Sequence, residues 1–156
     1  MTRTLYIGID PGASGGWCEL WPENPVCYPW KSAEDTAWHF RSLVERCEME
    51  DVEIMATVEK VGGYIGGAGN TGSAMFKFGH NTGMWEGVLL ALLIRHDLIT
   101  PQRWQKGIPG VAGCKEKSQR KNAIKSHAAR LYPQMKPTLK TADAICLAEY
   151  ARREGL

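Results

Sequence analysis

Three acidic residues lie where this sequence predicts strand ends or a helix start, and their side chains could share a metal site. Asp10 and Glu59 each end a segment of alternating apolar residues, and Asp143 falls in the first turn of the last expected helix. If the two strands are neighbours, both acids emerge at one edge of the sheet, opposite that helix. Clustered carboxylates repel one another unless a divalent cation neutralises them, and hard oxygen ligands select Mg²⁺ or Mn²⁺. Two such ions about 4 Å apart would clamp the attacking and leaving oxygens of a phosphodiester displacement.

Each acid also has a plainer interpretation when it is taken alone. An aspartate before Pro-Gly, as at Asp10, is commonly a turn residue. The helix dipole by itself favours an aspartate in a first turn, as at Asp143. A glutamate at a strand end is often simply solvated. The metal interpretation therefore depends on the three acids together with the basic segment that lies between Glu59 and Asp143.

The formal net charge of +2 conceals an uneven distribution along the 156 residues. Residues 1–100 carry 7 Lys and Arg against 13 Asp and Glu, whereas residues 101–140 carry 10 against 1. Within the expected helix 115–131, one acid accompanies six basic residues, namely Lys115, Lys117, Arg120, Lys121, Lys125 and Arg130. Solvated helix faces usually mix charges of both signs, whereas a face of one sign fits a track for DNA phosphates. This segment predicts a polyanionic partner.

The elements that would position these residues belong to an α/β fold. Period-two alternation and turn signals predict a three-strand antiparallel meander, a helix and a fourth strand, over residues 5–9, 17–21, 26–30, 32–48 and 52–59. After a glycine-rich loop at 62–72, the pattern predicts helices at 73–96, from Thr100-Pro101, at 115–131 and at 141–153, with a short strand at 98–100. The order describes one mixed five-stranded sheet, an antiparallel meander plus parallel strands, covered by helices.

Cysteine usage and the N-terminus favour a cytoplasmic protein. The five cysteines are an odd number without a C-x-x-C pair, which fits reduced thiols better than a disulfide framework or a zinc site. The first residues lack the apolar core of a signal peptide. The longest aliphatic run, Gly87–Ile94, is far shorter than the ~20 apolar residues of a membrane span, so no membrane partner is expected.

Six short motifs follow one another in order along most of the chain. They are Tyr6-Ile7-Gly8-Ile9-Asp10-Pro11-Gly12, Val58-Glu59-Lys60-Val61, Ser73-Ala74-Met75-Phe76-Lys77-Phe78-Gly79, Arg103-Trp104-Gln105-Lys106, Lys115-Glu116-Lys117-Ser118-Gln119 and Ala142-Asp143-Ala144. Together they resemble the RuvC-type Holliday junction resolvases of the RNase H-like superfamily, particularly the short phage-borne versions. The resemblance implies one RNase H-like nuclease domain over residues 1–156, acting in the bacterial cytoplasm or, for a phage protein, in the cytoplasm of its host.

The resemblance implies that Asp10, Glu59 and Asp143 bind the metals, with two Mg²⁺ expected per active site and Mn²⁺ as a substitute. The family has a further acid or a histidine three residues before its last aspartate, and here that position is Lys140. A protonated lysine cannot ligate a metal, which leaves three alternatives. The second metal site is incomplete, a water completes it, or Lys140 contacts the scissile phosphate.

The resemblance also assigns Lys106 and Lys117 to the substrate phosphates near the metals, with Lys117 part of the catalytic group. Basic charge along the segment extends the expected DNA contacts, which are Arg103, Lys106, Lys115, Lys117, Arg120, Lys121 and Lys140. The glycine-rich loop lacks the Gly-Lys-Ser/Thr ending of a P-loop, so no nucleotide cofactor is expected. In similar resolvases this stretch enters the junction centre with an aromatic residue. Tyr64 is the nearest candidate here, and it either stacks on an unpaired base or is a spectator in an exposed loop.

The expected function is that of a Mg²⁺-dependent endonuclease that resolves four-way or other branched DNA by paired nicks. The apolar stripe on the 73–96 helix exceeds what one sheet face would cover, so it forms either the interface of a homodimer or simply core packing. Three rivals remain: the same fold acting on RNA–DNA hybrids or flaps, a junction-binding protein without catalysis, and a sugar-kinase-like or actin-like ATPase. The ATPases need a two-lobed cleft, for which a single domain of this length is too short.

Overall fold

The computed structural model describes residues 3–22, 25–60 and 72–156. Its strands are β1 (Arg3–Asp10), β2 (Gly16–Leu20), β3 (Val26–Pro29), β4 (Val52–Glu59) and β5 (Arg95–Ile99). Its helices are α1 (Ala33–Met49), α2 (Gly72–Ala91), α3 (Pro101–Trp104), α4 (Lys117–Leu131), the 3₁₀ helix η1 (Pro133–Met135) and α5 (Ala142–Glu154).

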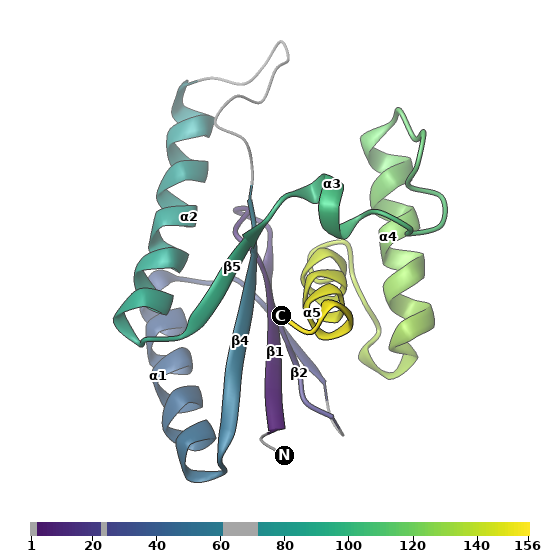
Figure 1. The fold of residues 1–156 in the computed structure, drawn as a ribbon. Coiled ribbons are helices and arrows are strands. Elements are labelled where there is room, and N and C mark those ends of the chain that lie inside the picture. Colours follow the sequence, from purple (N-terminus) through teal and green to yellow (C-terminus); the bar gives the residue numbers. More distant parts are fainter. Residues whose placement is uncertain (1–2, 23–24, 61–71) are drawn as a thin grey trace.

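The strands form one five-stranded sheet in the order β3-β2-β1-β4-β5. The β1–β2 and β2–β3 pairs are antiparallel, whereas the β1–β4 and β4–β5 pairs are parallel. The predicted mixed sheet, with its meander and its parallel strands, is therefore confirmed. In Figure 1, α1 and α2 cover one face, while α5 covers the other and α4 packs on the outer side of α5.

Buried side chains fill both faces of the sheet. Leu5, Ile7 and Ile9 of β1 point to the α1–α2 side, where they join a cluster that includes Phe40 and Trp85. The opposite cluster is centred on α5, from which Ala144, Ile145, Cys146, Leu147 and Ala148 are all buried. Because β1 is central and covered on both faces, its carboxyl end is held firmly by the core.

A glycine in β1 lets α5 lie directly on the sheet. A Cβ atom at Gly8 would collide with the backbone oxygen of Ala144 and would lie 2.5 Å from the backbone nitrogen of Ala148. Any larger residue at position 8 would therefore push the helix away from the strand. This close approach sets the height of the first turn of α5, which carries Asp143, above the end of β1.

The segment after α2 differs from the sequence-based expectation. The apolar periodicity predicts a helix to His96, but α2 ends at Ala91 and β5 already begins at Arg95 rather than at Leu98. The backbone N–H of Ile94 donates to the oxygen of Leu89, and Leu93 has a φ of 55°. This is a Schellman-type helix end with leucine in the left-handed position where glycine is usual, so the sequence carries no stop signal there.

Candidate functional site

The carboxyl ends of β1 and β4 bring two of the predicted acids to one edge of the sheet. These strands are parallel, with Ile9 opposite Val58, so Asp10 and Glu59 follow at the same end of the pair. Asp143 lies in the first turn of α5, which packs on β1. The side chains of Asp10 and Asp143 are buried, with 8% and 7% exposure. Three acids from distant parts of the chain thus gather around one end of β1.

The pKa values of Glu59 and Asp143 depend on burial and on the neighbouring acids. Burial, together with the negative charges of Asp10 and Asp143, raises the pKa of Glu59 to about 7. Burial also raises the pKa of Asp143, the Lys121 ammonium opposes that increase, and Asp10 adds to it. A carboxyl group is ordinarily ionised far below neutral pH, so burial and the neighbouring acids disfavour the ionised forms of Glu59 and Asp143 at this end of β1.

Each acid is held by a different kind of donor. The backbone N–H of Gly12 donates to Oδ1 of Asp10 over 2.9 Å. A Cβ at Gly15 would lie 2.7 Å from the Asp10 carboxyl carbon, so the turn after β1 must have glycine there to let the aspartate side chain fold back. The amine of Lys121 in α4 lies 3.4 Å from Oδ2 of Asp143, and this pair links α4 to α5.

Sequence reasoning missed the partner of Glu59. The indole Nε1 of Trp104 donates to Oε1 of Glu59 over 3.2 Å, and the Trp104 side chain is only 2% exposed. Trp104 lies in a motif whose basic residues, Arg103 and Lys106, predict DNA contacts by their charge. The available signal was the indole itself, which usually finds an acceptor for its N–H when it is buried.

The three carboxylates have the donor chemistry that Mg²⁺ or Mn²⁺ requires, and their shared excess of negative charge fits a divalent cation. Within the described part of the chain, however, no three His, Cys, Asp or Glu side chains form a single ready-made metal-binding group. Mg²⁺ commonly uses only one or two carboxylates and completes its shell with water and substrate phosphate oxygens. The acids here therefore have the donor chemistry for such an ion, with water and substrate oxygens as the other ligands.

The predicted basic residues divide into two groups in space. Lys117 starts α4 and is exposed, as is Lys115 just before it. Arg120 and Lys121, on the same helix, act electrostatically on Asp143. Arg103 and Lys106 instead line a pocket behind Trp104. Lys140 is exposed in the turn before α5. Tyr64 lies outside the described residues.

No protein-family model matches this chain, and no curated protein matches it in sequence. Solved structures, however, match it in fold. The structure described as T. thermophilus RuvC in complex with Holliday junction substrate superposes with a TM-score of 0.58, at 15% identity. The alignment covers 98% of this chain and 97% of that one. The chain has a RuvC-like fold.

A second RuvC structure, from Thermus thermophilus, gives a TM-score of 0.56 at 14% identity and covers 97% of this chain and 96% of that one. The RuvC-like fold matches the RNase H-like mixed sheet that the motifs predict. Among the helices that the structure describes, none is long and apolar enough to span a membrane.

Proposed function

We propose that this protein is a divalent-metal-dependent endonuclease that cuts four-way DNA junctions. The observation that carries the proposal is the gathering of Asp10, Glu59 and Asp143 at the end of β1, where burial and the neighbouring acids raise the pKa of Glu59 to about 7. The likeness to a RuvC structure in complex with a Holliday junction supports the choice of branched DNA as substrate.

Each metal ion would be held by a pair of carboxylates. Asp10, which is central, would contribute to both Mg²⁺ ions, Glu59 to one and Asp143 to the other. When bound, the ions would supply an activated water and stabilise the charge on the leaving oxygen, and the expected products are a 5′-phosphate and a 3′-hydroxyl. Gly12 and Trp104 keep two of the carboxylates in fixed orientations through their N–H donors.

Basic side chains around the acids would hold the DNA backbone. Lys117 at the start of α4 is exposed and makes no ion pair with any described residue, so it is available to a phosphate next to the cut. Lys121 would exchange Asp143 for a phosphate once metal neutralises that aspartate. A homodimer would place two such sites on one junction and nick two strands of like polarity.

The decisive experiment compares cleavage of a synthetic four-way junction by the wild type and by the variants Asp10→Asn and Asp97→Asn. We expect Asp10→Asn to lower the rate at least about 100-fold, since a catalytic metal contributes several kcal/mol to the transition state. Asp97 is an exposed carboxylate on β5, and its variant should cleave as the wild type does. Junction binding measured in Ca²⁺ should survive in both variants.

Two alternative outcomes have clear meanings. Tight junction binding by the wild type with no product at any Mg²⁺ or Mn²⁺ concentration would make the protein a junction-binding module. Faster cutting of RNA–DNA hybrids or flaps than of junctions, measured side by side, would move the proposal to those substrates. Full activity of Asp10→Asn would show that the acids at the end of β1 are not the active site.

A further inference from the structure

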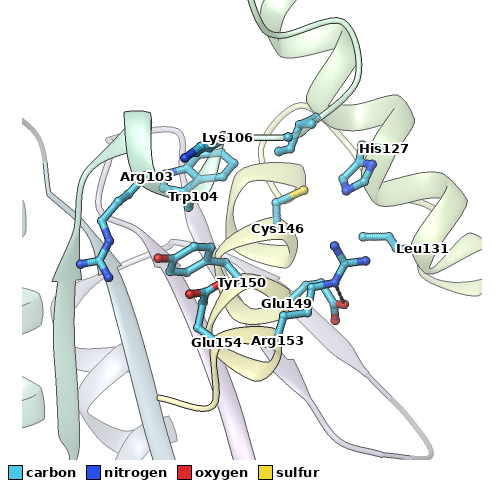
Figure 2. Close-up of a pocket in the computed structure, with 12 residues that line it drawn as sticks. Arg103, Trp104, Lys106, His127, Leu131, Cys146, Glu149, Tyr150, Arg153 and Glu154 are labelled. Atoms are coloured by element: carbon cyan, nitrogen blue, oxygen red, sulfur yellow. Dashed lines mark hydrogen bonds and ion pairs between the residues drawn. The ribbon is translucent and has the colours of Figure 1, made fainter.

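A pocket of about 400 Å³ opens on the side of α5 that faces α4 and the α3 segment, next to the carboxylate site. Figure 2 shows His127 of α4 beside Arg153 and Glu149 of α5, with Lys106 and Trp104 across the opening. Asp10, Glu59 and Asp143 do not line this space. Its volume falls in the range of sites that take a small ligand or a single group of a larger one.

Three basic side chains line the pocket against two glutamates, so its lining carries a small excess of positive charge. Glu149 is only 4% exposed, and its carboxylate already accepts from the hydroxyl of Tyr132 and from both Arg152 and Arg153. Of these two arginines only Arg153 lines the pocket, where it offsets the Glu149 carboxylate. Lys106 adds a charge that no described carboxylate pairs, and Arg103 adds another, against the single exposed acid Glu154.

Burial and nearby positive charges both affect the pKa of His127, which lines the pocket. Burial lowers the pKa of His127, and the positive charges of Arg130 and Arg153 lower it further, whereas Glu149 opposes them. A neutral imidazole keeps a hydrogen-bond donor without adding charge. The pocket thus offers arginine and lysine donors together with a neutral donor, which is the set of groups that binds a phosphate oxygen.

We propose that this pocket binds a phosphodiester group of the DNA strand that leaves the active site, with Arg153 and Lys106 as its principal contacts. The inference rests on the proposed function and extends the DNA path past the carboxylates to the C-terminal half of α5. Trp104 connects the carboxylate site to the pocket. Its indole N–H holds Glu59, and its ring forms part of the pocket wall.

Two adjacent arginines provide the test. Arg152 and Arg153 both pair with Glu149 at 2.7–2.8 Å and have similar exposures of 52% and 58%, but only Arg153 lines the pocket. Junction binding in Ca²⁺ is measured against salt concentration for the full chain, for Arg153→Gln and for Arg152→Gln. Each lost phosphate contact reduces the slope of log K against log salt by about 0.9. We expect that reduction for Arg153→Gln and no change for Arg152→Gln.

Lys106→Gln provides a second variant, because Lys106 is exposed and its loss leaves no described carboxylate unpaired. It should reduce the slope by a similar amount. Equal slopes for Arg152→Gln and Arg153→Gln, or an unchanged slope for both pocket variants, would overturn the proposal. Thermal unfolding of each variant identifies any loss of folded protein.

A second arm separates DNA from a free nucleotide. Thymidine 3′,5′-bisphosphate is titrated into the wild type and Arg153→Gln by calorimetry. Binding of this probe that depends on Arg153, combined with an unchanged DNA slope, would make the pocket a small-anion site and overturn the DNA assignment. Failure of the wild type to cleave a junction would instead overturn the proposed nuclease activity, and it leaves the salt slopes as an independent result.

Discussion

Glu59 shows how one residue's surroundings set the conditions under which this site can work. Burial and two neighbouring carboxylates raise its pKa to about 7, whereas the Trp104 hydrogen bond and the Lys121 charge act in the opposite direction. A protonated Glu59 cannot ligate a metal. Metal binding by this residue should therefore weaken as the pH falls through 7 and strengthen above it.

Replacing Trp104 by phenylalanine tests how its hydrogen bond affects the pKa of Glu59. The change removes the N–H that favours the ionised form of Glu59, so the pKa of Glu59 should rise above about 7. The acid limb of the pH–rate profile should consequently move to higher pH. Junction cleavage is measured from pH 5.5 to 9 at subsaturating Mg²⁺, because saturating metal would itself drive the proton off.

A matched control separates this effect from the loss of buried volume. Trp85 is 1% exposed and belongs to the cluster on the other face of the sheet, so Trp85→Phe removes a similar volume far from Glu59. The Trp85→Phe variant should be less stable than the wild type, and the acid limb of its pH–rate profile should stay at the same pH. Identical acid limbs for Trp104→Phe and the wild type would mean that the indole only fills space.

Among the secondary-structure elements, α2 has an unusual end. Leu93 has a φ of 55°, a conformation that costs a residue with a Cβ about 1–2 kcal/mol relative to glycine. Its side chain is 92% exposed, so it recovers little of that cost by packing. The backbone hydrogen bonds of the helix end hold it there nonetheless.

Leu93→Gly should therefore raise the free energy of unfolding by about 0.5–1 kcal/mol, after allowance for the greater freedom of glycine in the unfolded chain. Leu90→Gly, inside the last turn of α2 and 62% exposed, should lower it by about 1 kcal/mol. Chemical denaturation of both variants measures the difference. If both variants are destabilised alike, the helix end does not strain Leu93.

The elements differ in how much of them could be predicted from sequence, and the reason is the range of the interactions. The period-two patterns and turn residues are local signals, and they predict the ends of β1 and β4 at Asp10 and Glu59. The stop at Leu93 has no local signal, because its hydrogen bonds would usually be made around a glycine. The Trp104–Glu59 bond joins residues 45 positions apart, so no local pattern could reveal it.

At the scale of the whole molecule, the two faces of the sheet have different roles. The α5 face carries Asp143, the basic helix α4 and the cationic pocket. The other face carries α2, a largely apolar helix of which only Trp85 and Leu89 are buried. Phe76 and Leu90 are 74% and 62% exposed there. An apolar helix without a cover favours association, and we propose that α2 forms the two-fold interface of a homodimer.

If the protein acts as this proposed dimer, the pairing of two strand cuts should depend on the α2 interface. The double variant Phe76→Lys with Leu90→Lys changes only exposed side chains of α2, so the protomer should fold while the dimer dissociates. Light scattering after size exclusion should show half the wild-type mass. On a supercoiled plasmid with an extruded cruciform, the wild type should give linear DNA, whereas the double variant should give mainly nicked circles.

Leu139→Lys is the matched control for this experiment. Leu139 is also an exposed apolar residue, with 46% exposure, but it lies in the turn before α5 rather than on α2. Its variant should keep the wild-type mass. A wild type that is monomeric at micromolar concentration, or a double variant that still linearises the plasmid, would contradict the α2 interface. Either result would favour a protein whose carboxylate site nicks one strand at a time, without the proposed dimer.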